Sequence, residues 1–300
     1  MIQLFYKIIY YPPVNKLLLF INRAFSKYTA FRLPPSGTIE IKINKSASFK
    51  MMANQTSYVH KLLYWNGPLQ FEYTPIFIEL IKHCKVFIDV GSNTGYYSLL
   101  ASKCNPQVKV FAFEPARGPL HYINKNILLN NLQTQIEIQD IALSNQSGEV
   151  KFYEVRNKKY LYLKYNLSGV GSLTEDVTKR MYPVMAFTLD KFIWKTRIKS
   201  VDLIKIDTEG TENKILEGAS EIIRKFHPII ICEILFNKIE NDLETIMKEH
   251  GYLFFAFEKN NKRLKQLNSL TRLYDNGVRD CFFVHPTKIS TMSDLHYYLL

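Results

Sequence analysis

Five acidic residues lie at the ends of five short apolar runs, and their spacing is the main chemical signal in this chain. They are Asp89, Glu114, Asp140, Asp207 and Glu233. If the runs are parallel strands of one sheet, their carboxyl ends meet at the edge where open α/β sheets bind ligands. Carboxylates there can attract a cation, accept hydrogen bonds from hydroxyl groups or take up a proton. A purely structural sheet has little reason to gather acids at one edge, so the sequence predicts a ligand site.

The first of these runs leads into a glycine turn. Residues 86–95 read Val-Phe-Ile-Asp-Val-Gly-Ser-Asn-Thr-Gly, and a helical pattern follows Gly95. A strand, a glycine turn and a helix start form a pocket in which a nucleotide-like ligand can lie against bare backbone. A carboxylate at Asp89, two residues before Gly91, suits a ligand that carries positive charge. S-adenosylmethionine (SAM), with its ammonium and sulfonium groups, is such a ligand.

The second acid supports a nucleoside at the same place. Glu114 follows the turn by about one strand–helix–strand step, where an acid can bind both hydroxyls of a ribose. A nicotinamide enzyme would also place an acid there, but the dinucleotide fingerprint needs a glycine where this chain has Asn93. The turn therefore favours SAM over a dinucleotide. Asp140 and Ala142 follow the third run, and we expect them to flank the adenine.

The elements that must position these residues alternate between strands and helices. Strands are predicted at 86–90, 108–113, 135–139, 201–206 and 228–234, and helices at 95–103, 117–130, 213–223 and 239–250. Apolar strands separated by helices indicate a doubly wound parallel sheet. Two last strands, near 252–258 and 280–284, are expected to form an antiparallel hairpin at the edge. The predicted fold class is α/β, Rossmann-like, with a mostly parallel seven-stranded sheet and an antiparallel edge hairpin.

Composition sets the limits for the rest of the chain. With 300 residues, 47% hydrophobic and 22% charged, it can bury a large core. We expect an apolar and basic N-terminal region at 1–70, a catalytic domain at 71–286 and a tail at 287–300. The four cysteines form no metal-ligand motif, which predicts free thiols in a reducing compartment and no structural zinc.

The net charge of +12 favours acidic partners such as nucleic acid or anionic lipid, although a bias toward Lys, Asn and Ile codons explains it equally well. Residues 1–25 are apolar and basic, but Lys7 and the Pro12-Pro13 pair interrupt the run too early for a membrane span. We expect two amphipathic helices that dock on the core. Peripheral membrane contact through residues 1–25 is the alternative. Either way, a cytoplasmic location is expected.

Several segments together resemble the FkbM family of SAM-dependent methyltransferases. The resemblance covers roughly residues 84–286 and implies a class I methyltransferase fold, SAM as cofactor, and O-methylation of a macrolide, a sugar or a related hydroxylated molecule. The family's Asp-Val-Glu-Gly-Ala-Glu pattern stands here as Asp207-Thr-Glu-Gly-Thr-Glu212. The segments that carry the resemblance are Phe87-Ile-Asp-Val-Gly-Ser-Asn-Thr-Gly-Tyr-Tyr-Ser, Val110-Phe-Ala-Phe-Glu-Pro, Ala142-Leu-Ser-Asn-Gln-Ser-Gly-Glu-Val-Lys-Phe-Tyr, Thr188-Leu-Asp and Val201-Asp-Leu-Ile-Lys-Ile-Asp-Thr-Glu-Gly-Thr-Glu.

O-methylation requires that the acceptor hydroxyl lose its proton as the oxygen attacks the methyl group. Asp207 is the expected base, and Asp207 with Glu209 can instead ligate a divalent cation such as Mg²⁺ through hard oxygen donors. The alternative for Glu209 and Glu212 is a stabilising position at a helix N-terminus. Ser172 lies in an element similar to one of the family, which implies contact with the acceptor or the cofactor. Glu233, after the fifth run, is expected on the acceptor side.

Three functions remain open at this stage. The favoured one is a SAM-dependent methyltransferase that acts on a small-molecule or glycan acceptor. The second is an RNA methyltransferase, which the net charge suggests, but residues 207–210 lack the Asn/Asp-Pro-Pro-aromatic signature of amino-methylating nucleic-acid enzymes. The third is a non-catalytic protein of the same fold that docks on membranes. The sequence leaves the oligomeric state open.

Overall fold

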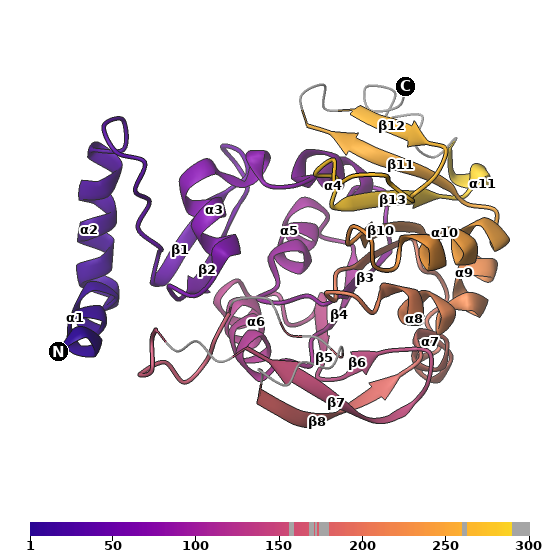
Figure 1. Ribbon diagram of the computed structural model, residues 1–300, viewed down its shortest axis with the longest axis horizontal. Coiled ribbons are helices and arrows are strands. Elements are labelled where there is room, and N and C mark those ends of the chain that lie inside the picture. The colour runs from indigo at the N-terminus through magenta and orange to yellow at the C-terminus, as the bar shows by residue number, and fades with distance from the viewer. Residues whose placement is uncertain (156–158, 168–170, 172, 174–179, 260–262, 290–300) are drawn as a thin grey trace.

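The computed structural model describes residues 1–155, 159–167, 171, 173, 180–259 and 263–289 (Figure 1). In this part of the chain the central sheet has eight strands, in the order β12-β11-β13-β10-β9-β3-β4-β5. Their bounds are β3 Val86–Val90, β4 Lys109–Phe113, β5 Ile136–Gln139, β9 Leu203–Ile206, β10 Ile229–Glu233, β11 Leu253–Glu258, β12 Arg263–Leu267 and β13 Asp280–Val284. The strands from β5 to β10 pair in parallel, which confirms the α/β, mostly parallel sheet.

The antiparallel edge of the sheet differs from the prediction in two respects. The strands predicted near 252–258 and 280–284 do pair antiparallel, but β13 lies between β10 and β11. The edge hairpin is instead formed by β11 with β12, an eighth strand that the prediction of seven omitted. The segment Arg-Leu-Lys-Gln-Leu reads as a polar connection because only Leu264 is buried, as is usual for a charged edge strand.

Helices cover both faces of the sheet because successive strand residues point to opposite sides. Phe87 packs in a cluster with α4 (Thr74–Ile81), α5 (Tyr96–Cys104) and α6 (Arg117–Leu129). Its neighbour Ile88 packs in a second cluster with α7 (Leu189–Thr196), α8 (Glu212–Glu217), α9 (Ser220–Phe226) and α10 (Glu240–Glu249). The sheet is therefore doubly wound. Apart from the two N-terminal helices described below, the other helices in the described ranges are α3 (Tyr58–Asn66), the 3-10 turn Pro68–Gln70 and α11 (Pro286–Ile289).

The helix predicted at 213–223 is divided into α8 and α9. A Cβ atom at Gly218 would lie 2.2 Å from the carbonyl oxygen of Ser144, so the chain passes too close to its neighbour there for a side chain. Ser144 follows β6 (Ala142–Leu143), which forms a small second sheet with β7 (Gly148–Glu154) and β8 (Arg180–Phe187).

The N-terminal region contains the two expected helices, α1 (Ile2–Ile9) and α2 (Pro12–Ala24), followed by the hairpin of β1 (Gly37–Lys42) and β2 (Ser48–Ala53). The hairpin shares the core of the large domain, since Ile41 and Met51 belong to the same buried cluster as Phe87. The helices bury much less: α2 buries Asn15 and Leu19, and α1 buries no residue. No helix in the described ranges is long and apolar enough to cross a membrane.

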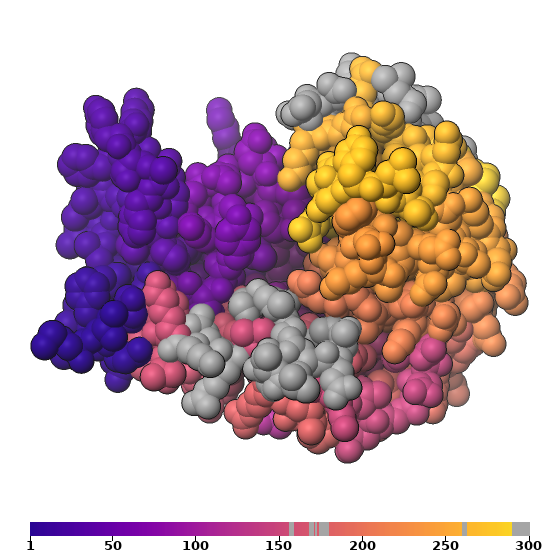
Figure 2. Space-filling view, viewed as in Figure 1, coloured from indigo at the N-terminus to yellow at the C-terminus, as the bar shows by residue number. Residues whose placement is uncertain are grey.

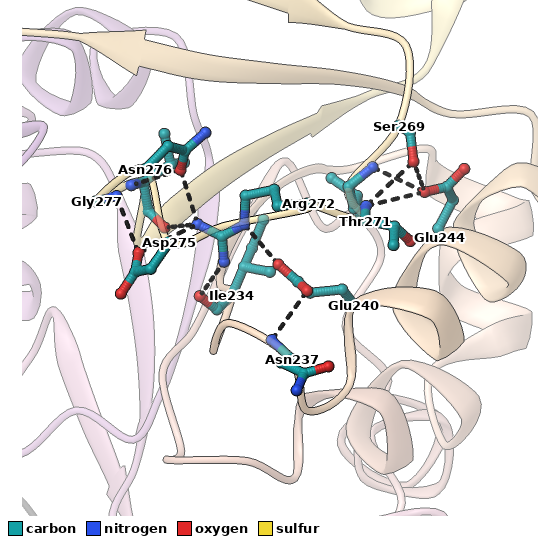
Figure 3. Close-up of polar contacts among 12 residues, drawn as sticks. Ile234, Asn237, Glu240, Glu244, Ser269, Thr271, Arg272, Asp275, Asn276 and Gly277 are labelled. Carbon is teal, nitrogen blue, oxygen red and sulfur yellow. Dashed lines mark hydrogen bonds and ion pairs between the residues drawn. The ribbon is translucent and has the colours of Figure 1, made fainter.

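A buried ion pair fixes the chain that follows β10. Arg272 donates from Nε to Glu240 at 2.6 Å, and its Nη2 donates to the carbonyl oxygen of Ile234 at 3.4 Å (Figure 3). Glu240 also accepts from the backbone N–H of Asn237 at 3.0 Å. Because Ile234 directly follows Glu233, this network holds the end of β10 in place beside the cavity described below.

Candidate functional site

A cavity of about 260 Å³ opens at the carboxyl ends of β3, β4, β9 and β10. The second sheet closes its far side with Ala142 and Phe152. Of the residues predicted from the sequence, seven line the cavity: Gly91, Asn93, Glu114, Ala142, Asp207, Glu209 and Glu233. Of the five acids expected at this edge of the sheet, three line the cavity and two do not. Asp89, Gly95 and Asp140 are not among the lining residues, and Ser172 lies outside the described residues.

The glycine turn after β3 is shaped by a close contact with the end of β9. Gly91 has φ +70°, and a Cβ atom there would lie 1.9 Å from the carbonyl oxygen of Asp207. The backbone N–H groups of Gly91 and Ser92 both donate to the carbonyl oxygen of Phe113, at 3.0 and 3.1 Å. Gly95 is the N-cap of α5 and has a left-handed backbone conformation, which favours glycine. This conformation explains why position 95 is a glycine although it does not line the cavity.

Replacing Gly91 with alanine is expected to displace the end of β9, because the new methyl group and the Asp207 carbonyl oxygen cannot both keep their positions. We expect a loss of about 1–3 kcal/mol in the free energy of unfolding and weaker SAM binding, measured by urea unfolding and calorimetry. Gly67→Ala is the matched control. Gly67 has a similar φ of +80° but nothing within 4 Å of the added Cβ, so equal losses would show that strain alone is responsible.

Glu114 is buried at the end of β4 with one side toward the cavity. Its two carboxylate oxygens accept from the backbone N–H of Asn93 at 2.7 Å and of Ala116 at 2.8 Å. Burial raises the pKa of Glu114 to about 7, against the effect of these two hydrogen bonds. The carboxylate therefore holds the glycine turn and also faces the space where the ribose of SAM was expected.

The pKa of Glu114 predicts that SAM affinity changes with pH. Below about pH 7 the carboxyl takes up a proton and loses charge-assisted acceptor strength, so wild-type affinity is expected to fall as the pH decreases from 8 to 6. Glu114→Gln should bind SAM about 10- to 100-fold more weakly at pH 8, as expected for a lost hydrogen bond to a charged group. Calorimetry at several pH values tests both. A variant that kept the wild-type pH dependence would exclude Glu114 as its source.

Asp89, expected to contact SAM, is buried and does not line the cavity. Its side chain is buried beneath the turn, where Ser98 Oγ donates to Oδ2 at 2.6 Å. Lys205 stands beside it in register on the neighbouring strand β9. Burial raises the pKa of Asp89, and Lys205 opposes that rise. The cation that offsets Asp89 thus belongs to the protein, and sequence spacing alone cannot distinguish it from a cation on the ligand.

Lys205 is the functional residue that the sequence analysis missed. Its ammonium lies 3.0 Å from Asp207 Oδ2, and its side chain is 4% exposed against 39% for Asp207. Burial by itself lowers the pKa of Lys205, but the carboxylates of Asp207, Asp89 and Glu72 raise it above the ordinary value. Lys205 therefore stays charged and joins the buried Asp89 to the cavity. A lysine within the apolar run Leu-Ile-Lys-Ile was the available signal.

Three carboxyl groups gather at the wall formed by β9 and β10. Asp207, Glu209 and Glu233 each offer one oxygen, and the three atoms lie within 4.8 Å of one another. Burial, followed by the charges of Asp207 and Glu209, raises the pKa of Glu233 to about 9, and the pKa of Glu209 is raised by burial and by Asp207. Glu233 is therefore protonated near neutral pH, while Asp207 has a cation partner in Lys205.

Glu212 has the structural role that was its alternative. It is buried at the start of α8, and its carboxylate accepts from the backbone N–H groups of Thr208 at 2.8 Å and Gly210 at 3.0 Å. These bonds hold residues 207–210 in a tight loop in which Glu209 has φ +62°. Glu209 is thereby placed at the cavity, not at the helix N-terminus. Among the described residues that line the cavity there is no histidine.

One family model matches this chain, and several known proteins are similar to it. The model of the methyltransferase FkbM domain matches residues 89–254. The 31-O-demethyl-FK506 methyltransferase FkbM of Streptomyces tacrolimicus is 27% identical over 63% of this chain and 84% of its own length. Methyltransferase sdnD of Sordaria araneosa is 26% identical over 61% and 82%. The hexuronic acid methyltransferase AglP of Haloferax volcanii is 22% identical over 58% and 66%.

Proposed function

Because this chain belongs to the FkbM family of SAM-dependent methyltransferases, we propose that it methylates a hydroxyl oxygen of a neutral acceptor. The class I methyltransferase fold and SAM as the methyl donor follow from the family and the sheet. A sugar, a glycolipid precursor or another small hydroxylated metabolite is the proposed acceptor. The observation that carries this choice is the carboxyl group of Asp207 at the cavity wall, 3.0 Å from the buried ammonium of Lys205.

The residues around the cavity fit SAM. The turn at Gly91 has bare backbone where a side chain would collide with β9, and Asn93 and Ala142 line the same space. Glu114 presents a buried carboxylate that can accept from ribose hydroxyls. When bound, SAM supplies a methyl group on a positively charged sulfur. The carboxylates of the lining favour a positively charged ligand by simple attraction.

Asp207 is proposed as the base that receives the proton of the acceptor hydroxyl. Its side chain is 39% exposed and lines the cavity, and the ammonium of Lys205 lies 3.0 Å from its Oδ2. Glu233 is protonated under the same conditions, so it can donate a hydrogen bond to an acceptor oxygen but cannot accept a proton. One carboxylate that accepts and one carboxylic acid that donates would orient a hydroxyl group between them.

A divalent cation at Asp207, Glu209 and Glu233 is the competing mechanism, with Mg²⁺ the ion expected from the sequence. The spacing of the three oxygens permits it. Two features favour Asp207 as a base over a metal site. Asp207 already has Lys205 as a cation partner, and Glu233 would have to lose a proton held with a pKa of about 9 before it could ligate a metal.

The acidic lining also limits the acceptor. Besides the three acids just named, Glu72, Glu114 and Glu154 line the cavity. Glu233 is protonated near neutral pH, but no basic residue is among the described residues that line the cavity. Phosphate groups of RNA and carboxylates of acidic sugars would therefore find no cation there, whereas neutral hydroxyl groups would find acceptors for their hydrogen bonds. This supports a neutral hydroxylated acceptor over RNA. One relative is named as a methyltransferase of 31-O-demethyl-FK506, which agrees with a small hydroxylated acceptor. Another is named as a methyltransferase of hexuronic acid, an acidic sugar, so hexuronic acid belongs among the acceptors to be tested.

Transfer of label from methyl-labelled SAM tests the proposal. The acceptor panel contains neutral hexoses and disaccharides, hexuronic acids and transfer RNA. We expect label on a neutral sugar that survives mild alkali, because an ether is stable where a methyl ester is hydrolysed. Alkali-labile label on hexuronic acid, or label on RNA, would contradict the proposal.

Activity should also persist in EDTA. A loss of activity that Mg²⁺ restores would show that a metal site, and not Asp207 as a base, activates the acceptor hydroxyl.

A further inference from the structure

The two N-terminal helices expose apolar side chains on the side that faces away from the protein. They form one end of the molecule, indigo in Figures 1 and 2. The exposed fractions reach 60% for Leu17 and 73% for Phe20, although both are large apolar residues. We define the N-terminal apolar face by six such residues: Leu4, Phe5, Ile8, Leu17, Phe20 and Phe25.

The opposite sides of these helices are used for packing, so the exposed face is not a result of loose folding. In α1, Tyr6 and Tyr10 contact the ring of Tyr160 at centroid distances of 5.1 and 5.6 Å. In α2, Leu19 is buried and the Asn15 side chain bonds to the backbone of Pro34 and Ser36. Each helix thus has a fixed inner side and an apolar outer side.

The charge of residues 1–39 indicates which kind of binding partner suits the N-terminal apolar face. Residues 1–39 contain no acidic residue and five basic ones: Lys7, Lys16, Arg23, Lys27 and Arg32. A second copy of this chain would bring the same positive charges against one another, which opposes self-association through this face. Apolar side chains interleaved with lysine and arginine are typical of helices that lie in the interface of an anionic membrane.

We propose that α1 and α2 dock this protein on an anionic lipid surface, with the N-terminal apolar face inserted among the lipid chains and Lys16 and Lys27 at the headgroups. The helices are too short to cross the bilayer, so they lie in its surface. This docking is independent of the proposed acceptor, because SAM binding and methyl transfer to a soluble acceptor need no lipid.

The docked helix is also connected to the cavity. Gln3 donates from Nε2 to the carbonyl oxygen of Lys159 at 3.0 Å and accepts from the backbone N–H of Leu161 at 3.2 Å. The same segment continues to Asn166 and Leu167, which line the cavity. Docking through α1 therefore brings a wall of the cavity near the membrane, where an acceptor carried by a lipid would be found.

Vesicle flotation tests the proposal with the full chain. Wild-type protein is expected to float with vesicles of phosphatidylcholine and phosphatidylglycerol, much less with phosphatidylcholine alone, and less at high salt. Lys16→Glu/Lys27→Glu should lower partitioning by at least about 30-fold, since each lysine near an anionic surface contributes about one factor of five. Lys195→Glu/Lys199→Glu, at or just after α7 on the other end of the molecule, is the matched control and should float like wild type.

A second pair of variants tests the apolar part. Leu17→Ser/Phe20→Ser should abolish flotation, and Leu128→Ser/Leu273→Ser, which changes exposed residues elsewhere, should preserve it. Calorimetry with SAM should give the same affinity for all variants, which shows that they are folded and separates docking from methyl transfer. Flotation unchanged in both N-terminal variants would overturn the proposal. So would a wild type that does not float but forms a dimer that Leu17→Ser/Phe20→Ser dissociates.

Discussion

Replacing Asp207 with asparagine is expected to slow methyl transfer by about 10²- to 10⁴-fold, the usual contribution of a positioned base. Asparagine has nearly the same size but cannot take up a proton. SAM affinity should change little, because Glu114 and the glycine turn remain in place. Single-turnover rates with saturating SAM give the effect on transfer, and calorimetry gives the affinity.

Two controls make this result specific. Asp242→Asn alters an exposed aspartate on α10 and should leave the rate unchanged. Glu209→Gln changes the neighbouring acid without removing the carboxylate that Lys205 holds, so its effect should be smaller than that of Asp207→Asn. A fully active Asp207→Asn enzyme would exclude Asp207 as the base.

The largest effect on stability is expected from Lys205→Met. The change removes the cation from a position between the buried Asp89 and Asp207, and breaking a buried ion pair on one side costs about 3–5 kcal/mol. Urea unfolding measures the loss in the free energy of unfolding. Asp89→Asn in the same chain should recover part of it, because the double variant no longer contains the uncompensated buried carboxylate.

Lys109→Met is the matched control on β4, which lies on the other side of β3 from β9. Lys109 is 39% exposed and lies 3.6 Å from Glu137, which is 45% exposed, so this pair contributes at most about 1 kcal/mol. If the two lysine variants lost the same free energy, the interpretation of Lys205 as the charge that balances Asp89 would be wrong.

The sequence was sufficient to predict much of the site, because the chemistry follows short-range patterns. Gly91, Asn93 and Glu114 were located from a glycine turn and from an acid one strand later, and all three line the cavity. Asp207 and Glu233 were located in the same way at the ends of later strands. Each inference needed only a strand, its last residue and the rule that parallel strands share a ligand-binding edge.

The surroundings of Asp89 depend on contacts between distant segments. Asp89 and Lys205 are 116 positions apart, and they become neighbours only because β9 pairs with β3 in one particular register. The order of polar and apolar residues within either strand does not indicate which residues of the two strands pair. Glu72 was missed for a similar reason: it precedes α4 at φ +42° and receives a hydrogen bond from Tyr97 at 2.7 Å, neither of which has a local sequence signal.

Some errors in the fold have the same kind of cause. The strand β12 is half polar because it forms an edge, and β8 contains Pro183, which argues against a strand interior. The break between α8 and α9 depends on the approach of Ser144 to Gly218, which is a tertiary contact. Local patterns predict the buried elements well, and they fail where a neighbouring segment decides the conformation.

A crystal structure with bound S-adenosylhomocysteine is the most direct test of the central claim, that this cavity is the methyl-donor site with Asp207 beside the reacting centre. We predict that the ribose hydroxyls donate to the Glu114 carboxylate and that the sulfur points toward the wall formed by Asp207, Glu209 and Glu233. A nucleoside bound elsewhere, or a sulfur directed away from Asp207, would contradict the account.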